Sequence, residues 1–176
     1  VKGNTDLLLQ EVLKGTEGQG VEVEKLIVDK LNISPCKEYN ACLKTGNCVI
    51  RDDMDGIYEK LLQANVVIVA SPMFFYGVTS QLKALIDRCQ ALWARRYVLK
   101  QEPDSERKGA FVAVGATKGE KLFDGSILTM KYFFQAIGVQ YAGDLLIRSV
   151  DRKGEIKDHP TALTDAFELG RKLAQG

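Results

Sequence analysis

Apolar residues recur along the chain at two spacings, one typical of helices and one typical of strands. Helical spacing predicts helices over residues 4–13, 54–63, 79–94, 124–137 and 160–174. Runs rich in valine, isoleucine and leucine predict strands over residues 21–28, 66–70, 110–114 and 139–147. Residues 31–53 carry a proline, a glycine and three cysteines without a clear period, so we expect an irregular excursion there.

The alternation of strands and helices predicts an α/β fold built on a parallel sheet. The strand Val66-Val67-Ile68-Val69-Ala70 is apolar on both faces, which is typical of a sheet covered by helices on both sides. No internal repeat or linker interrupts the 176 residues, so we expect residues 1–176 to form a single domain. In such sheets ligands bind at the carboxyl ends of the strands, where the chain direction brings several loops together.

Composition and charge narrow the classes of function. The chain has 24 basic and 23 acidic residues, a net charge of +1, which disfavours binding to duplex nucleic acid. No apolar run approaches the ~18 residues of a membrane-spanning helix, and residues 1–6 show no signal-peptide pattern. The four cysteines sit in a chain rich in core residues, which indicates a reducing compartment. We therefore expect a cytoplasmic protein with neither a nucleic-acid nor a membrane partner.

Three segments stand where strand-end loops are expected. Gly3, Asn4 and Thr5 open the first helix, whose free amides form an anion site, although such a segment also serves simply as a cap. Residues 71–77 follow a buried strand and contain three successive aromatic residues, which cannot all face one core. Residues 115–119 form a loop bracketed by glycines that can approach a ligand closely, or that is merely a turn.

Taken together, these segments resemble the NADPH-dependent FMN reductase and iron–sulfur flavoprotein branch of the flavodoxin-like superfamily. The resemblance rests on three stretches: Gly3-Asn4-Thr5; Ser71-Pro72-Met73-Phe74-Phe75, followed by QLKALIDR at residues 81–88; and Gly115-Ala116-Thr117-Lys118-Gly119. It implies a flavodoxin-like, doubly wound parallel sheet of five strands with helices on both faces. It also implies an oxidoreductase that passes hydride or electrons from NAD(P)H through bound FMN to a flavin, quinone or other small acceptor.

The resemblance further implies a role for each segment. The FMN phosphate would sit on Gly3, Asn4 and Thr5, and the isoalloxazine ring would lie beside residues 71–75 and Gly77. The loop from Gly115 to Gly119, with Lys118, would approach the pyrimidine side of the ring and stabilise negative charge there. The family also implies a homodimer, or a dimer of dimers, with the helix at residues 79–94 in the interface.

The sequence departs from the family pattern at its start and in its cysteines. Family members begin with an apolar central strand, so we expect the natural chain to carry about ten further residues before Val1. Iron–sulfur members hold a cluster with four closely spaced cysteines, whereas this chain has Cys36, Cys42 and Cys48, with Tyr39 where a fourth ligand is expected. A 4Fe–4S cluster normally takes four thiolates, so we do not expect one. The three cysteines either pack as small apolar residues or are remnants of a lost cluster site.

Two further readings belong to other classes of function. One is a carrier of single electrons that is reduced by ferredoxin and has no nicotinamide site, although the near-zero charge offers no strongly charged docking face. The other is a flavin-free binding module that has kept the fold. A hydrolase is disfavoured, because His159 is the only histidine and no Gly-x-Ser-x-Gly turn accompanies it.

Overall fold

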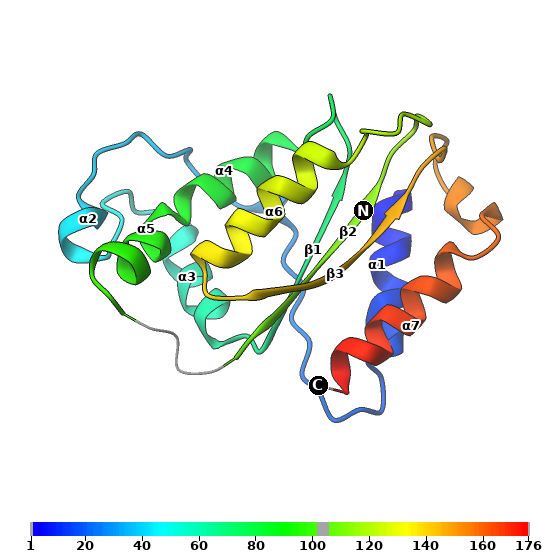
Figure 1. The fold of residues 1–176 in the computed structure, drawn as a ribbon, viewed down its shortest axis with the longest axis horizontal. Coiled ribbons are helices and arrows are strands. Elements are labelled where there is room, and N and C mark those ends of the chain that lie inside the picture. Colours follow the sequence, from blue (N-terminus) through cyan, green and yellow to red (C-terminus); the bar gives the residue numbers. More distant parts are fainter. Residues whose placement is uncertain (1, 102–105, 176) are drawn as a thin grey trace.

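Three parallel strands form the sheet at the centre of the protein (Figure 1). The computed structural model describes residues 2–101 and 106–175. Strand β2 (Lys108–Val114) lies in the middle, between β1 (Val66–Pro72) and β3 (Gln140–Ile147), and pairs in parallel with both. Each connection between neighbouring strands contains a helix, as parallel pairing requires. The predicted α/β class and the parallel sheet are therefore confirmed.

Helices cover both faces of this sheet, as predicted. One face carries α1 (Asn4–Gly15) and α7 (Ala162–Ala174), and the other carries α3 (Met54–Gln63), α4 (Ser80–Arg88), α5 (Gln90–Trp93) and α6 (Asp124–Ala136). Shorter elements are α2 (Cys42–Thr45), the 3-10 turns η1 (Val28–Lys30) and η3 (Glu155–Asp158), and the π-helical turn η2 (Ala94–Val98). Every helix in the described ranges is too short or too polar to cross a lipid bilayer.

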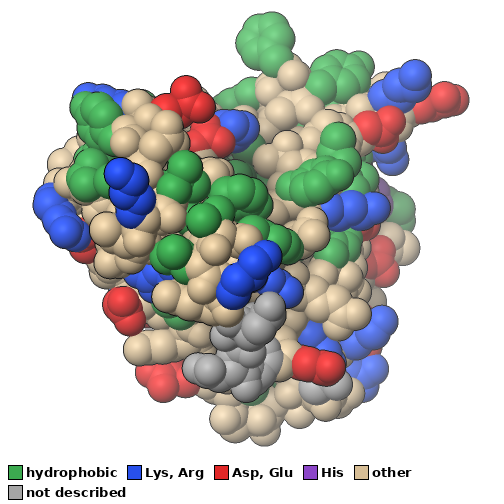
Figure 2. All heavy atoms as spheres, turned by 60° about the vertical axis from the view of Figure 1, so that its left-hand side comes forward, with side chains coloured by type: hydrophobic (Ala, Val, Ile, Leu, Met, Phe, Trp, Pro, Cys, Tyr) green, Lys and Arg blue, Asp and Glu red, His purple; other side chains and the backbone are tan. Residues whose placement is uncertain are grey.

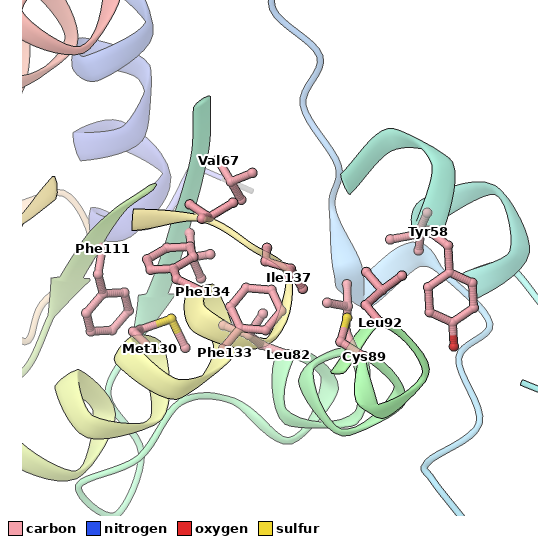
Figure 3. Close-up of a cluster of buried hydrophobic side chains, with 14 of the residues drawn as sticks. Tyr58, Val67, Leu82, Cys89, Leu92, Phe111, Met130, Phe133, Phe134 and Ile137 are labelled. Atoms are coloured by element: carbon pink, nitrogen blue, oxygen red, sulfur yellow. The ribbon is translucent and has the colours of Figure 1, made fainter. Parts of the chain in front are cut away.

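The side chains of each strand alternate between two separate apolar cores. Val67, Val69 and Phe111 point into the larger core, where they meet buried residues of α3 to α6. Figure 3 shows this cluster, with Phe111, Met130 and Phe134 packed together. Val112 and Val114 point the other way, into the core beneath α1 and α7. Because β2 contributes to both cores, six of its seven residues are buried, which explains its almost wholly apolar sequence.

Helices α1 and α7 pack so closely that their backbones touch. A Cβ atom at Gly170 would lie 1.9 Å from the carbonyl oxygen of Val12, and one at Gly15 would lie 2.1 Å from the carbonyl oxygen of Phe167. Glycine is therefore required at both positions by space rather than by backbone conformation. This contact fixes the C-terminal part of α1 against α7.

Two predictions of secondary structure need correction. The expected strand at residues 21–28 has no regular secondary structure up to Ile27 and pairs with no strand among the described residues, and Val21, Val23 and Leu26 are exposed. The sheet was expected to have five strands, but it has three within the described residues. The strand prediction at residues 21–28 is therefore wrong, because a strand needs a neighbouring backbone to bond, which the alternating pattern does not reveal.

The helix predicted for residues 79–94 is confirmed only in part, since it breaks at Cys89. The amide of Cys89 donates to the carbonyls of both Leu85 and Ile86, and the chain then continues as α5 and the π-helical turn η2. The other predicted helices agree with α1, α3, α6 and α7 to within about two residues, the usual uncertainty of helix ends.

A buried ion pair ties the irregular excursion to α4. The Arg88 and Asp52 side chains are 0% and 3% exposed, and their Nη1 and Oδ2 atoms lie 2.6 Å apart. Arg88 also donates to the carbonyl oxygens of Ser34 and Ile50, at 2.9 and 3.0 Å. One side chain of α4 thus holds the excursion near both ends of its cysteine-bearing part.

The same pair makes the stability of the protein depend on pH. Burial opposes ionisation of Asp52, but hydrogen bonds from Arg88 and from the amides of Ser34 and Met54 outweigh it, so the pKa of Asp52 lies below its ordinary value of 3.8. A carboxylate whose pKa is lowered on folding stabilises the protein above its unfolded pKa. That contribution is lost as the pH falls through the folded pKa.

We expect Asp52→Asn to lower the free energy of unfolding by about 3 kcal/mol at neutral pH, because it leaves a buried arginine without its counter-charge. The difference from the wild type should shrink as the pH falls from the ordinary value of 3.8 through the lower pKa of the folded state, because the wild-type carboxylate is then protonated too. Urea unfolding at several pH values measures this. Asp55→Asn is the control, since Asp55 pairs with Arg51 at the surface. An equal effect of the two substitutions, or a difference that does not depend on pH, would contradict the assignment.

Candidate functional site

The register of the sheet brings three strand ends to one edge. Pro72, the last residue of β1, pairs with Val114 of β2, which pairs with Ile147 of β3. The loops that follow, residues 73–79, 115–123 and 148–161, therefore leave the sheet side by side. Helix α1 starts at the same edge, because the Asn4 side chain bonds to the last of these loops. This edge is where a ligand of an open parallel sheet binds.

The first loop projects from the edge as a tight aromatic hairpin. The amide and carbonyl groups of Phe74 and Gly77 bond to each other in both directions, at 2.9 Å. The two residues between them, Phe75 and Tyr76, both have positive φ, 48° and 63°. Aromatic residues rarely adopt this conformation, so the turn is strained. Phe74, Phe75 and Tyr76 are 60%, 106% and 51% exposed, and the expectation that these rings do not all enter the core is confirmed.

The base of this hairpin is fixed by bonds to its surroundings. Ser71 is buried, and its hydroxyl donates to the carbonyl of Pro72 and accepts from the amide of Thr79. The Met73 amide donates to the carbonyl of Val114, and the Ser126 hydroxyl lies 3.6 Å from the Met73 sulfur. The Ser71 hydroxyl therefore bonds to the backbone at both ends of the loop rather than facing a ligand. Strain at the tip is tolerated because the base is held.

The second loop presents unused hydrogen-bond donors. The amide of Gly115 donates to the carbonyl of Ile147, but within the described residues the amides of residues 116–121 donate no hydrogen bond. Ala116, Thr117 and Lys118 are exposed. Successive free amides form a surface that favours anionic or carbonyl oxygen atoms. The phenol of Tyr76 covers one side of this loop, because a Cβ atom at Gly119 would lie 2.7 Å from its hydroxyl oxygen.

The start of α1 joins this arrangement through the third loop. The amides of Ser149 and Val150 donate to the carbonyls of Thr117 and Gly115. Further along the same loop, the Asn4 side chain accepts from the amides of Gly154 and Ile156 and donates to the carbonyl of Arg152. The Asn4 side chain is thus engaged within the protein. Gly3 is the N-cap of α1 and leaves the first amides of the helix without a side-chain cap.

The structure places all three predicted segments at one edge. The hairpin touches the loop at residues 115–119, and that loop reaches the start of α1 through residues 149–156. Sequence reasoning missed Arg148, whose guanidinium bonds to the carbonyls of Gly119 and Glu120. It also left Tyr76 out of the site. The only signal for Arg148 was its position directly after a predicted strand.

The three cysteines of the excursion lie near one another. Burial raises the pKa of the Cys42 thiol, and the neighbouring Cys48 and Cys36 raise it further. All three thiols are free and half-buried. Cys89 lies apart from them in the larger core, where burial raises the pKa of its thiol to about 12 (Figure 3). Among residues 2–101 and 106–175, no group of three or more histidine, cysteine or acidic side chains is arranged to hold a metal ion.

Comparison with known proteins gives matches over most of the chain. The profile of the NADPH-dependent FMN reductase family matches residues 1–133. An iron–sulfur flavoprotein of Methanocaldococcus jannaschii is 37% identical over 99% of this chain and 90% of its own length. Another, from Archaeoglobus fulgidus, is 38% identical over 71% of this chain, and the match spans 63% of that relative.

The fold matches solved flavoprotein structures as well. The NAD(P)H:quinone oxidoreductase of Methanothermobacter marburgensis has a TM-score of 0.68 at 18% sequence identity, over 98% of this chain and 90% of that one. At this identity the likeness concerns the fold, which is flavodoxin-like as the sequence indicated.

Two of these relatives are named as iron–sulfur flavoproteins, so the residues of this chain can be compared with what an iron–sulfur cluster and a flavin each require. Tyr39 stands where a fourth thiolate is expected and is 62% exposed, so the donor set does not fit a four-thiolate cluster. The strand-end edge, by contrast, fits a planar ligand that carries a phosphate. It combines exposed aromatic rings, a row of free amides, a glycine loop that approaches closely and an uncapped helix start.

The strain of the hairpin can be tested without a ligand. Phe75→Asn should raise the free energy of unfolding by about 1 kcal/mol, because asparagine accepts a positive φ more readily and the fully exposed ring loses no packing. Urea unfolding measures the change. Phe74→Asn is the control, since Phe74 is exposed but has no positive φ. A variant at residue 75 that is no more stable than the wild type would show that the turn is unstrained.

Proposed function

The chain belongs to the NADPH-dependent FMN reductase family, and from this premise we propose that it is an FMN-dependent oxidoreductase that takes electrons from NAD(P)H. Its acceptor would be a flavin, a quinone or another small molecule that reaches the open strand-end edge. The observation that carries the proposal is the convergence of the exposed aromatic hairpin, the row of free amides at residues 116–121 and the start of α1. We propose that residues 1–176 act as one FMN-binding domain.

When bound, FMN supplies the transfer of hydride and electrons between the nicotinamide and the acceptor. The protein binds and orients it. Pro72, Met73, Phe74, Phe75 and Gly77 would border the isoalloxazine ring, since the hairpin exposes their rings and backbone at the edge. Ser71 supports this segment from beneath through its hydrogen bonds to Pro72 and Thr79.

The amides at Ala116, Thr117, Lys118 and Gly119 would bind the pyrimidine carbonyls of the ring. Their unused N–H groups favour negative charge, and the exposed ammonium of Lys118 adds to this. Gly115 anchors the loop to β3. Such preorganised donors act where charge builds up on reduction.

The phosphate would bind at the start of α1, at the amides near Gly3 and Thr5, where the helix dipole favours an anion. The Asn4 side chain instead holds residues 152–156, so its part is to place this helix start beside the other loops. We assign the protein to the cytoplasm, where its four free thiols are stable.

Reconstitution with FMN tests the proposal. The wild type should take up FMN, show flavin absorption and oxidise NADPH with a flavin or quinone acceptor. Gly119→Ala should weaken FMN binding about tenfold, because the added Cβ would displace Tyr76 from the loop. Gly56→Ala is the matched control, since a Cβ there meets no atom within 4 Å.

Two results would overturn this function. A wild type that takes up no FMN would indicate the flavin-free binding module. Bound FMN that is reduced by ferredoxin but not by NADPH in stopped-flow mixing would indicate the single-electron carrier.

The protein would act as a homodimer that joins the outer surfaces of α4, α5 and α6. A groove of about 460 Å³ runs between these helices, with Ile86 and Trp93 on one side and Tyr132 on the other. Leu128 and Tyr132 of α6 are 56% and 66% exposed. Figure 2 shows hydrophobic side chains gathered on this side of the molecule.

The charges beside the groove suit a second copy of the same chain. Lys83 and Asp87 lie along its α4 side and carry opposite signs. In a two-fold interface a patch meets itself, so a patch that carries both signs can be self-complementary.

Replacing both Leu128 and Tyr132 by glutamate should convert the dimer to a monomer, because the charges would lose their hydration at the interface. Light scattering after size exclusion should give about twice 19.5 kDa for the wild type and 19.5 kDa for the variant. Phe167→Glu, on the exposed side of α7, should remain a dimer. A monomeric wild type or a dimeric double variant would refute this interface.

A further inference from the structure

One exposed side chain at the end of β3 holds the loop that follows β2. The Arg148 guanidinium donates from Nε to the carbonyl of Gly119, at 3.2 Å, and from Nη2 to the carbonyl of Glu120, at 2.9 Å. Its central carbon lies 5.0 Å from the centre of the Phe123 ring, which is fully buried. The cation thus has a fixed aromatic base and two successive backbone acceptors.

The direction of these carbonyls decides where the neighbouring amides point. In a planar trans peptide the C=O and N–H bonds point in opposite directions. The carbonyls of Gly119 and Glu120 turn toward Arg148, so the amides of Glu120 and Lys121 in the same peptide units turn away from it. Neither amide has a hydrogen-bond acceptor among the described residues. The Gly119 carbonyl also accepts from the amide of Leu122, whereas Arg148 is the donor to the Glu120 carbonyl.

The hairpin also contacts this loop. The Tyr76 hydroxyl lies where a side chain at residue 119 would begin, and the Tyr76 carbonyl lies 3.3 Å from a Cβ placed at Gly125. Gly119 does not have the positive φ that demands glycine, so glycine is needed there for space. The loop therefore contacts both Tyr76 and Arg148 at Gly119.

We infer that Arg148 is a positioning residue for flavin binding, which holds the end of the 116–121 loop and so orients the amides of Glu120 and Lys121 without touching the ligand itself. This inference rests on the proposed function. The proposed role requires the forked geometry of the Arg148 guanidinium. A lysine ammonium at this position would keep the charge but could not contact both carbonyls and the aromatic ring at once.

The test compares Arg148→Met and Arg148→Lys with the wild type by flavin fluorescence quenching on titration with FMN. Both variants should raise the Kd for FMN about tenfold, because both lose the two-carbonyl contact. The effect should persist at high salt, which screens exposed charges. Lys157→Met is the matched control, because it removes an exposed charge from the loop at residues 148–161 and should leave the Kd unchanged.

A second readout separates this inference from the proposed function. In the protein without FMN, both Arg148 variants should move the amide NMR signals of Glu120 and Lys121, while the thermal midpoint stays within a few degrees of the wild type. Full recovery of FMN affinity in Arg148→Lys, or a loss that disappears at high salt, would show a simple charge effect and overturn the inference. Unchanged amide signals would overturn it as well, whereas a wild type that binds no FMN would refute the proposed function instead.

Discussion

The parallel register of β1, β2 and β3 is the constraint on which the rest of the structure depends. It ends the three strands at Pro72, Val114 and Ile147, side by side, so the loops that follow are neighbours although they lie far apart in sequence. The register is fixed because β2 is buried on both faces. A slip of one residue would exchange the side chains of the two cores.

The edge built in this way combines rigid supports with an exposed, strained tip. The side chains of Ser71, Asn4 and Arg148 form hydrogen bonds within the protein. The groups that remain accessible at this edge are backbone amides and aromatic rings. In the function proposed above, such a site would bind a flat, phosphate-bearing ligand mainly through backbone amides and aromatic rings.

The irregular excursion between η1 and α3 is held in place by side chains from neighbouring helices. Its conformation depends on the buried Arg88–Asp52 pair and on Arg95, which donates to the carbonyl of Gly46 and to the side chain of Asn47. The three cysteines of this segment lie near one another, while the Tyr39 side chain is exposed to solvent. The excursion is therefore held by contacts with α4 and η2.

The sequence by itself determined the fold class, the main helices, the three paired strands and the loops that gather at the site, because periodicity and glycine or proline punctuation are local properties. It also indicated the family, through stretches such as QLKALIDR. Only the tertiary structure decided that residues 21–27 stay unpaired, that Asn4 and Ser71 bond inward, and that Tyr76 and Arg148 enclose Gly119. These features depend on partners distant in sequence, and a residue's own preferences do not specify which groups the fold will bring beside it.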